Sequence, residues 1–449
     1  MRSMVEGEEN GCVIDGSSLV IICPREAYDS TRNFVDARCH RSWSESGRLR
    51  ILRPKAMALR EVGRIAARVR EQYSGHGLTV WVHPSIEIRE DWFPAEAVVI
   101  RVDNIAKARK QLASLLVSLE LDLVGSVVRA VGRAWEHSRL DREHVTTWIR
   151  QFETLGSHGW VAKRLLQGID FWPTERTLDA LKISEDGLEG IDCITTNRYV
   201  PGRSGDALAV KVRKRLRGFK SPSVPLEALD VALKGGAFRQ IAVVEDSLIS
   251  GDEFERVIRA LVGDLATGQT GRAERLEDLQ ALRERKLLFR FAVVTDIGLS
   301  RFASLVARYA LGGFRLDCGS CRLYRLMSEA GQQALDGNAF FDHLNCIVDQ
   351  DGYINYPAFA PDLWRAESRR QRAIHFCRSI GAQLFSRYAE REGKRWNEAR
   401  VDQAGIGYGL LLAFSHSIPK LTLPILWLEG DCEFEGRRLH WEPLFRNAQ

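Results

Sequence analysis

The thirteen residues Ile241–Glu253 carry the most distinctive chemical pattern in the chain. Four apolar residues precede Glu245 and Asp246, and Ser250 and Gly251 follow shortly before a predicted helix. Carboxylates accept hydrogen bonds from sugar hydroxyls, and backbone N–H groups at a helix N-terminus hold phosphate. The pattern therefore favours a site for a phosphorylated ribose, and we expect both acids at an exposed end of the strand. It is also compatible with a plain strand-to-helix turn in which Ser250 only caps the helix.

A second loop with anion-binding chemistry follows an earlier predicted strand. It contains Arg198 and Arg203, and then Ser204 and Gly205 at the point where a helix is expected to begin. Guanidinium groups and helix N-terminal amides suit a pyrophosphate or another anion, although an ordinary surface loop has the same composition. Because both loops follow consecutive strands of a predicted parallel sheet, we expect them at neighbouring strand ends.

Two further groups of residues have weaker patterns. Cys318, Cys321, His343 and Cys346 have the spacing of a four-ligand zinc site, but such quartets arise easily by chance. We predict instead that they are small buried residues on helices and that zinc is absent. The basic run Lys211–Lys220 would suit a nucleic acid, and a solvated helix face explains it equally.

The elements that must position the two loops follow the order strand, loop, helix. Predicted strands cover Ile191–Thr195, Gln240–Val244 and Leu287–Thr295, and the last two are near-continuous apolar runs, as expected for strands buried on both faces. This order predicts an α/β domain with a parallel sheet. Beyond residue 300 we expect mainly helices, until a strand-like run at Leu421–Trp427.

The N-terminal part, residues 1–140, is predicted to be a smaller α/β unit of unknown role. Its expected strands are Ser18–Cys23, Leu78–His83 and Ala97–Val102, with a helix at Ala56–Tyr73 and a helical region at 105–137 that breaks near Gly125. No site motif is found in it, and a docking or regulatory platform is its expected role. The second domain is expected to cover residues 145–449.

Composition limits the class of protein. The 449 residues include 45% hydrophobic residues, which is enough for buried cores, and the net charge of +5 is too small to imply nucleic-acid binding by itself. Nine cysteines, an odd number in a core-rich chain, favour reduced thiols. No apolar run reaches the length of a membrane-spanning helix, and the first 15 residues contain Glu6, Glu8 and Glu9 where a secretory signal would carry bases. We therefore expect a soluble cytoplasmic protein.

The sequence also resembles a known family. Ile241–Glu253 resembles the phosphoribosyl-pyrophosphate signature of type I phosphoribosyltransferases, and Tyr199–Asp206 resembles their pyrophosphate loop. Five other segments resemble the phosphoribosyltransferase-like domain of bacterial conflict-system effectors, PRTase-CE, over roughly residues 145–446: Trp148–Phe152, Arg164–Leu166, Gly407–Gly409, Leu423–Trp427 and Trp441–Phe445.

The resemblance implies a parallel sheet of type I phosphoribosyltransferase (Rossmann-like) topology with helical additions, after the smaller N-terminal α/β unit. It implies an effector of a bacterial conflict or antiphage system that acts on phosphoribosyl pyrophosphate or a nucleotide with Mg²⁺, together with a protein partner from the same defence operon and no membrane. Roles carry over by position: Glu245 and Asp246 for the ribose hydroxyls and metal-bound waters, Ser250 and Gly251 for the 5′-phosphate, and Arg198, Arg203, Ser204 and Gly205 for the pyrophosphate.

Departures from the family pattern leave alternatives open. Glu253 stands where the signature often has a threonine, and Asp252 adds another carboxylate, so that two anions are near the expected phosphate. The segment Ser415–Thr422 departs from a more asparagine-rich form. One alternative is a catalytically silent nucleotide-binding sensor or scaffold. Another is a nucleic-acid-binding component of the same system, which would use the basic runs Lys211–Lys220 and Arg365–Arg372.

Overall fold

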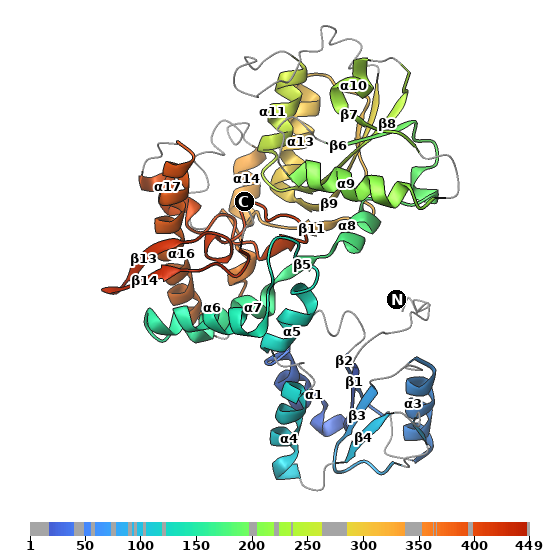
Figure 1. The fold of residues 1–449 in the computed structure, drawn as a ribbon, viewed down its shortest axis with the longest axis vertical. Coiled ribbons are helices and arrows are strands. Elements are labelled where there is room, and N and C mark those ends of the chain that lie inside the picture. The colour runs from blue at the N-terminus through green and yellow to red at the C-terminus, as the bar shows by residue number, and fades with distance from the viewer. Residues whose placement is uncertain are drawn as a thin grey trace. The chain divides into compact units, whose positions relative to one another are not determined.

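The chain forms two compact units (Figure 1). The N-terminal unit comprises Met1–Gly132, Asp141–Thr146 and Leu166–Gly168, and the C-terminal unit comprises Arg133–Leu140, Thr147–Leu165 and Ile169–Gln449. The structure, a computed structural model, describes residues 18–39, 49–54, 59–72, 78–88, 92–93, 97–101, 105–118, 123–196, 204–219, 224–234, 237–262, 285–336, 353–361, 363–364, 366–393 and 398–446.

The N-terminal unit is built on a parallel four-stranded sheet in the order β2-β1-β3-β4. Its strands are β1 (Ser18–Ile22), β2 (Leu49–Leu52), β3 (Leu78–Val82) and β4 (Val98–Arg101). Its helices are α1 (Arg25–Asp36), α3 (Leu59–Gln72), α4 (Ile105–Ser118) and α5 (Leu123–Val131). Since β1 precedes both of its neighbours in the chain, the direction of winding reverses between β1 and β3.

Helices cover both faces of this sheet because its strands are apolar on both sides. Leu19 and Ile21 of β1 pack on the side of α1 and α4, whereas Val20 and Ile22 pack on the side of α3. The three predicted strands are confirmed to within a residue at each end, and β2 was missed. The predicted helical region is divided into α4 and α5, as expected, but Gly125 lies inside α5 rather than at the division.

The C-terminal unit is built on a second parallel sheet, in the order β10-β9-β8-β6-β7, with β11 also paired to β9. Its strands are β6 (Cys193–Thr196), β7 (Leu226–Ala228), β8 (Gln240–Leu248), β9 (Lys286–Thr295), β10 (Phe314–Leu316) and β11 (Arg322–Tyr324). The winding reverses between β6 and β8, so this sheet has the same kind of switch point as the sheet of the N-terminal unit. The prediction of an α/β fold with a parallel sheet is confirmed.

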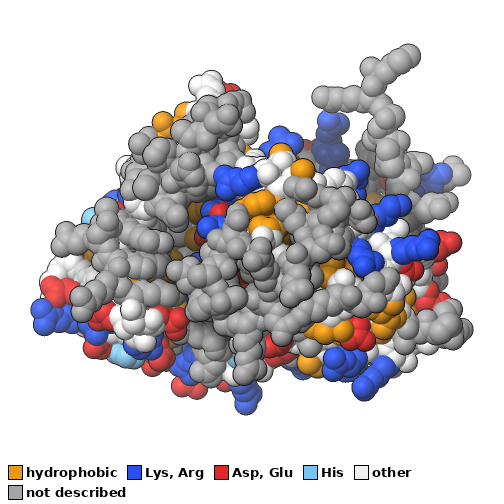
Figure 2. All heavy atoms as spheres, turned by 90° about the horizontal axis from the view of Figure 1, so that it is seen from above, with side chains coloured by type: hydrophobic (Ala, Val, Ile, Leu, Met, Phe, Trp, Pro, Cys, Tyr) orange, Lys and Arg blue, Asp and Glu red, His pale blue; other side chains and the backbone are white. Residues whose placement is uncertain are grey.

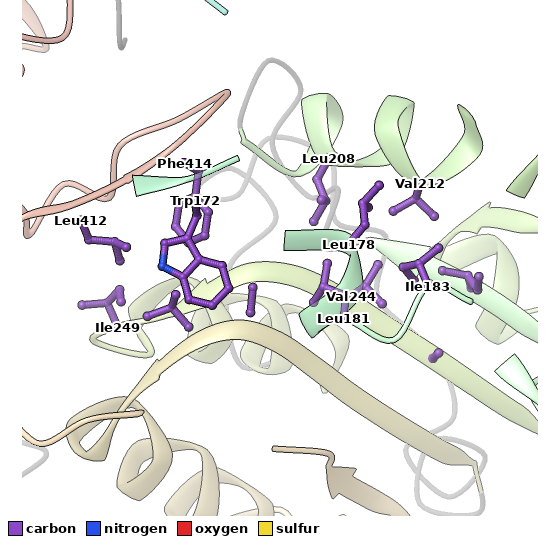
Figure 3. Packing of buried hydrophobic residues seen from close by; sticks show 14 of the residues in the cluster. Trp172, Leu178, Leu181, Ile183, Leu208, Val212, Val244, Ile249, Leu412 and Phe414 are labelled. Atoms are coloured by element: carbon purple, nitrogen blue, oxygen red, sulfur yellow. The ribbon is translucent and has the colours of Figure 1, made fainter. Parts of the chain in front are cut away.

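Helices cover both faces of the second sheet. Ile241 and Val243 of β8 pack with α10 (Leu229–Lys234), α11 (Asp252–Leu261) and α13 (Asp296–Arg308). Ala242 and Val244 pack with α8 (Thr174–Ala180) and α9 (Ser204–Leu216), and Figure 3 shows Val244 beneath Leu208 and Val212 of α9. The same cluster includes Trp172 and Phe414, which belong to a small parallel sheet of β5 (Asp170–Trp172) and β12 (Leu412–Phe414).

The remaining elements are mainly helical. They are α6 (Arg142–Thr154), α7 (Gly159–Gly168), α14 (Glu329–Asp336), α16 (Glu367–Arg391), α17 (Glu398–Ala404), the antiparallel hairpin of β13 (Gly430–Phe434) and β14 (Arg437–Trp441), and the 3₁₀ turns η2 (Asp186–Leu188), η3 (Pro357–Phe359) and η4 (Pro424–Leu426). The strand predicted at Leu421–Trp427 is wrong. Pro424 lacks the N–H that a strand ladder needs, and it begins η4 instead. Among the described residues, no helix is long and apolar enough to cross a membrane.

Candidate functional site

The two acids of the predicted ribose site lie inside β8 rather than after it. The strand continues to Leu248, four residues past its predicted end at Val244. Because successive side chains of a strand point to opposite faces, Glu245 is on the α10, α11 and α13 side, and Asp246 is on the α9 side. Glu245 is half-buried. The two carboxylates therefore lie in different environments.

Asp246 is buried, with 5% of its surface exposed. The Ser247 hydroxyl donates to its Oδ1 at 3.0 Å, and the Ser417 hydroxyl donates to its Oδ2 at 2.9 Å. Burial raises the pKa of Asp246, but the contacts with His416, Ser417 and Ser247 together outweigh burial and hold the pKa below its ordinary value. The expectation that both acids lie at an exposed strand end is thus wrong for Asp246, since a segment distant in sequence covers it.

His416 is the closest basic group to Asp246. Its Nε2 atom lies 3.3 Å from Oδ2 of Asp246, close enough for an ion pair but without the alignment of a hydrogen bond. Only 4% of His416 is exposed, and neither ring nitrogen has a hydrogen-bond partner among the described residues. The imidazole is therefore a buried polar group with unused hydrogen-bonding capacity.

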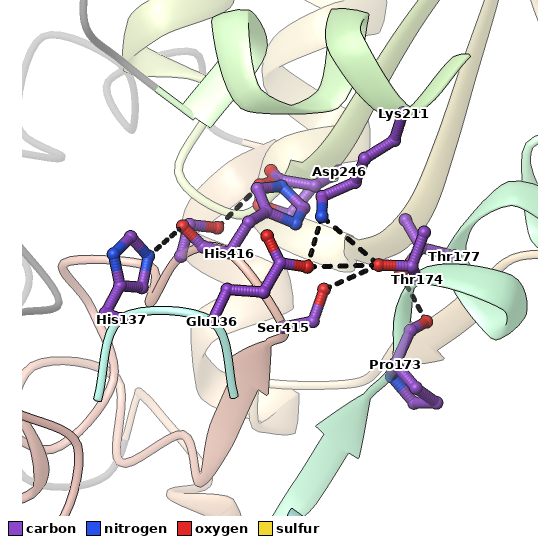
Figure 4. Close-up of polar contacts among 11 residues, drawn as sticks. Glu136, His137, Pro173, Thr174, Thr177, Lys211, Asp246, Ser415 and His416 are labelled. Carbon is purple, nitrogen blue, oxygen red and sulfur yellow. Dashed lines mark hydrogen bonds and ion pairs between the residues drawn. The ribbon is translucent and has the colours of Figure 1, made fainter. Parts of the chain in front are cut away.

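The segment that carries His416 is held from several sides, as Figure 4 shows. His137 donates from Nε2 to the His416 carbonyl at 2.7 Å. Backbone hydrogen bonds join Ser415 to Trp172 of β5 and to Glu136, at 2.9 and 3.0 Å. The position of the imidazole beside β8 is thus fixed by contacts outside its own loop.

A lysine of α9 joins the same network. Lys211 forms an ion pair with Glu136 and donates to Thr174 at 3.2 Å, and the hydroxyls of Thr174 and Ser415 lie 2.9 Å apart (Figure 4). Burial raises the pKa of Glu136, but hydrogen bonds from Lys211 and Ser415 outweigh burial and bring the pKa below its ordinary value, so the carboxyl stays ionised. Lys211 belongs to the basic run of the sequence, and this contact neutralises it.

The predicted phosphate loop joins β8 to α11. Gly251 has a positive φ of 76°, a backbone conformation that residues other than glycine rarely adopt. The Ser250 hydroxyl accepts from the Asp252 N–H at 3.2 Å, so Ser250 contributes to the start of α11, as the capping alternative expects. The predicted 5′-phosphate role of this loop is compatible with that contact, since one hydroxyl satisfies only one N–H group at the helix start.

Arg301 of α13 fixes the loop from the other side. Its Nη1 atom donates to the Ser250 carbonyl at 3.1 Å and forms an ion pair with Asp252, while its Nε atom donates to Glu255 at 2.7 Å. The arginine side chain is 9% exposed. Asp252 is therefore neutralised by a buried cation, which weakens the repulsion of a phosphate that its charge suggested.

Thr295 at the end of β9 adds a second tie to the same loop. Its hydroxyl donates to the Ile249 carbonyl at 2.5 Å and accepts from the Gly298 N–H at 2.9 Å, where it caps α13. The loop geometry is thus set jointly by β9 and α13.

The predicted pyrophosphate loop is described only in part. Arg198 and Arg203 lie outside the described residues, and Ser204 begins α9, next to the buried Gly205. Strand β6 pairs with β8 in parallel, with Thr196 opposite Val244, so both loops leave the same edge of the sheet. The Thr196 hydroxyl is fully buried and has no hydrogen-bond partner among the described residues. By strand alternation it lies on the α9 side, as Asp246 does.

The cysteine pair of the zinc quartet is not on a helix. Cys318 is exposed and Cys321 is half-buried in a turn before β11, so the expectation of buried helical residues is wrong for these two. His343 and Cys346 lie outside the described residues. In the described part of the chain, no group of three or more His, Cys, Asp or Glu residues is arranged to hold a metal ion.

Several residues of the site were not predicted from any sequence motif. His416 lies in the segment Ser415–Thr422 that departs from the family pattern, and this departure was the only signal for it. Arg301 and Glu136 had no sequence signal, whereas Thr196 lies at the start of the segment that leads into the predicted pyrophosphate loop. They reach the site through the pairing of strands and the packing of helices.

One comparison with known proteins gives a match. The family model PRTase-CE matches residues 145–447, which is more than half of the chain. No curated protein and no solved structure matches the chain.

Proposed function

Since the chain belongs to the PRTase-CE family, we propose that it is a cytoplasmic effector of a bacterial conflict or antiphage system that acts on a nucleotide or phosphoribosyl substrate. The substrate binds at the carboxyl edge of β6 and β8. One observation carries this proposal: Thr196 and His416 present buried polar atoms with no partner among the described residues, on the same side of the sheet as Asp246. Buried polar atoms are nearly always hydrogen-bonded, so a bound ligand is the natural partner.

In this proposal, a phosphorylated ribose contacts residues on both faces of β8. Ser250, Gly251 and the first N–H groups of α11 hold the 5′-phosphate, because a helix N-terminus carries partial positive charge. Glu245 accepts hydrogen bonds from the ribose hydroxyls. Asp246 is committed to Ser247 and Ser417, and it acts on the ligand by orienting His416.

The start of α9 serves the second anion. Ser204 and Gly205 offer helix N-terminal amides, and Arg198 and Arg203 precede them in the chain. Mg²⁺ is commonly held by one or two carboxylates plus substrate phosphates, so a magnesium ion here needs no dedicated cluster of protein ligands. Bound there through the substrate phosphates, it would neutralise the charge of a leaving pyrophosphate.

In this arrangement the protein acts mainly by position. The two anion sites fix the phosphates at either end of the sugar, and the bond between the anomeric carbon and the pyrophosphate oxygen breaks with both electrons leaving on that oxygen. A nitrogen of the accepting base then forms the new bond to the same carbon. Glu245 holds the hydroxyls as positive charge develops on the ring.

A catalytically silent sensor is the second candidate, and the burial of Asp246 favours it. An acid already engaged by two hydroxyls and an imidazole is less able to exchange them for a sugar. Such a protein would bind the ligand without turnover and pass the signal to a partner protein from the same operon. Pyrophosphate release separates the candidates, because only the enzyme produces it.

The nucleic-acid alternative is weakened by the partners of the basic run. Lys211 is paired with Glu136, and Arg215 is paired with Glu175 and Asp179, so both cations are already neutralised. On the face drawn in Figure 2, the described Lys and Arg side chains are interspersed with acidic ones. Phosphate-backbone binding requires unpaired cations along one track.

A pair of glutamate variants tests the site. Glu245→Gln removes the charge proposed to hold the ribose, and we expect it to abolish protection in a phage plaque assay while thermal unfolding stays cooperative. Glu253→Gln removes an exposed carboxylate eight residues along the chain and should protect cells as the wild type does. Full protection by a folded Glu245→Gln protein would remove the assignment.

A further inference from the structure

A cavity of about 600 Å³ lies in the N-terminal unit. It is lined by Pro24 and the helix α1 that follows β1, by Trp81, His83 and Ser85 at and beyond the end of β3, and by one face of α4. Its volume is in the range of small-molecule sites, roughly 300 to 1,000 Å³. No contiguous sequence motif marks this cavity, because its lining comes from three separate segments.

The position of the cavity matches the topology of its sheet. Winding reverses between β1 and β3, and in open α/β sheets ligands bind beyond the carboxyl ends of the strands at such a reversal. Pro24 directly follows the loop after β1, and His83 directly follows β3. The cavity is therefore at the switch point itself, the place that corresponds to the edge of β6 and β8 in the C-terminal unit.

The lining separates into an apolar floor and a polar rim. Trp81, Ala108 and Leu112 are at most 5% exposed and form the floor. Glu26 and Arg109 are exposed at the rim, together with serine hydroxyls. A ligand that fits this division has a planar apolar part and a charged part.

The floor contains an unsatisfied donor. The indole Nε1–H of Trp81 has no acceptor among the described residues, although the side chain is only 2% exposed. A buried donor without a partner costs about 1 to 3 kcal/mol, and an acceptor on a bound ligand would remove that cost. The planar part of the ligand should therefore carry hydrogen-bond acceptors at its edge.

The rim favours an anion next to hydroxyl groups. Helix α1 is twelve residues long, and its N-cap residue Pro24, which lines the cavity, makes no side-chain capping hydrogen bond, so the first N–H groups of the helix have no side-chain cap. Arg109 adds a full positive charge, and Glu26 is an acceptor for hydroxyls.

His83 accepts the Ser85 N–H at Nδ1 at 3.3 Å, which leaves the proton of the neutral ring on Nε2. Burial lowers the pKa of His83, so the ring stays neutral at neutral pH.

We propose that this cavity binds a ribonucleoside 5′-monophosphate. The base lies on the floor and accepts from Trp81 Nε1–H, the ribose hydroxyls reach Glu26, and the phosphate lies between Arg109 and the start of α1. A bare metal ion does not fit, because no three-ligand cluster exists among the described residues.

Photoaffinity labelling of the full chain locates the site. With 8-azidoadenosine 5′-monophosphate as the probe and peptide mapping by mass spectrometry, we expect adducts in peptides from α1, the end of β3 or α4, and competition by AMP. Adducts confined to peptides around β6 and β8 would overturn this proposal while supporting the proposed function. The absence of any specific adduct would also overturn it.

Matched variants on α4 test the assigned contacts by calorimetry with AMP. Arg109→Gln should weaken binding about tenfold or more, whereas Lys110→Gln makes the same charge change on the neighbouring exposed residue and should leave affinity unchanged. Trp81→Phe keeps an aromatic floor but removes the donor, and it should also weaken binding if the variant folds. Equal affinities of the Arg109→Gln and Lys110→Gln proteins would contradict the proposal.

Discussion

Glu245 and Asp246 are neighbours in the chain but differ in what they can do. The alternation of β8 turns them to opposite faces, and only Asp246 is enclosed by the segment that carries His416 and Ser417. The sequence pattern predicted a ribose-binding role for both residues. Their separation was not, because it depends on contacts with residues some 170 positions later in the chain.

The lowered pKa of Asp246 predicts an acid-dependent stability. A carboxyl whose pKa is depressed on folding contributes stability above its unfolded pKa, about 3.9, and that contribution is lost as pH falls through the lower folded value. Asp246→Asn should therefore lower the free energy of unfolding at pH 7 by about 2 kcal/mol and by less at pH 3. Ser417→Ala should change stability in the same direction by a smaller amount. Urea unfolding at both pH values measures this, and a pH-independent difference would contradict it.

Replacing Gly251 by alanine should lower the stability of the protein for two reasons. Its φ of 76° disfavours any side chain, and an added Cβ would lie 2.9 Å from Cδ of Arg301. Gly190 has a similar φ of 73° with nothing within 4 Å of an added Cβ, so it isolates the backbone part. We expect Gly190→Ala to cost about 1 kcal/mol and Gly251→Ala clearly more, measured by chemical unfolding. Equal costs would show that Arg301 yields without penalty.

At the scale of elements, the site depends on the joint of β8, α11 and α13. Thr295 and Arg301 both hold the connecting loop through its backbone carbonyls. The sequence predicted the strand and the helix on either side, since one is apolar and the other is amphipathic. It did not predict what fixes the loop, because those partners come from the next strand-helix pair.

A substitution at Arg301 tests how far this residue of α13 holds the loop between β8 and α11. Arg301→Gln removes the ion pairs with Asp252 and Glu255 and leaves two carboxylates near the phosphate loop, so we expect a loss of about 2 kcal/mol in stability and weaker phosphate binding. Arg308→Gln on the same helix removes an exposed charge and should change neither. Differential scanning fluorimetry with and without phosphoribosyl pyrophosphate gives both readouts. Unchanged stabilisation by the ligand in Arg301→Gln would show that the loop does not need the arginine.

The ends of elements were predicted less well where tertiary contacts decide them. We predicted that β8 ends at Val244, because acids are uncommon inside strands. In the structure, the hydroxyls of Ser247 and Ser417 hydrogen-bond to Asp246, so the strand continues past it. The run at Leu421–Trp427 has the composition of a strand, but Pro424 diverts it, and the shorter β12 pairs with β5 instead.

At the scale of the whole molecule, two parallel sheets each carry one reversal of winding. The family match covers residues 145–447, and the cavity of the N-terminal unit lies outside it. A contiguous motif marks only the reversal between β6 and β8. The lining of the other is spread over α1, β3 and α4, so sequence patterns could predict the strands there but not the cavity.

The central claim, that the edge of β6 and β8 binds a phosphorylated ribose, is tested most directly by calorimetry. The full chain is titrated with phosphoribosyl pyrophosphate in the presence and absence of Mg²⁺, alongside the Glu245→Gln and Glu253→Gln variants. We predict binding with Mg²⁺ and much weaker binding without it, a large loss in Glu245→Gln, and affinity in Glu253→Gln at or above that of the wild type, since an exposed negative charge is removed. Failure of the wild-type protein to bind under either condition, while it still protects cells, would contradict the claim.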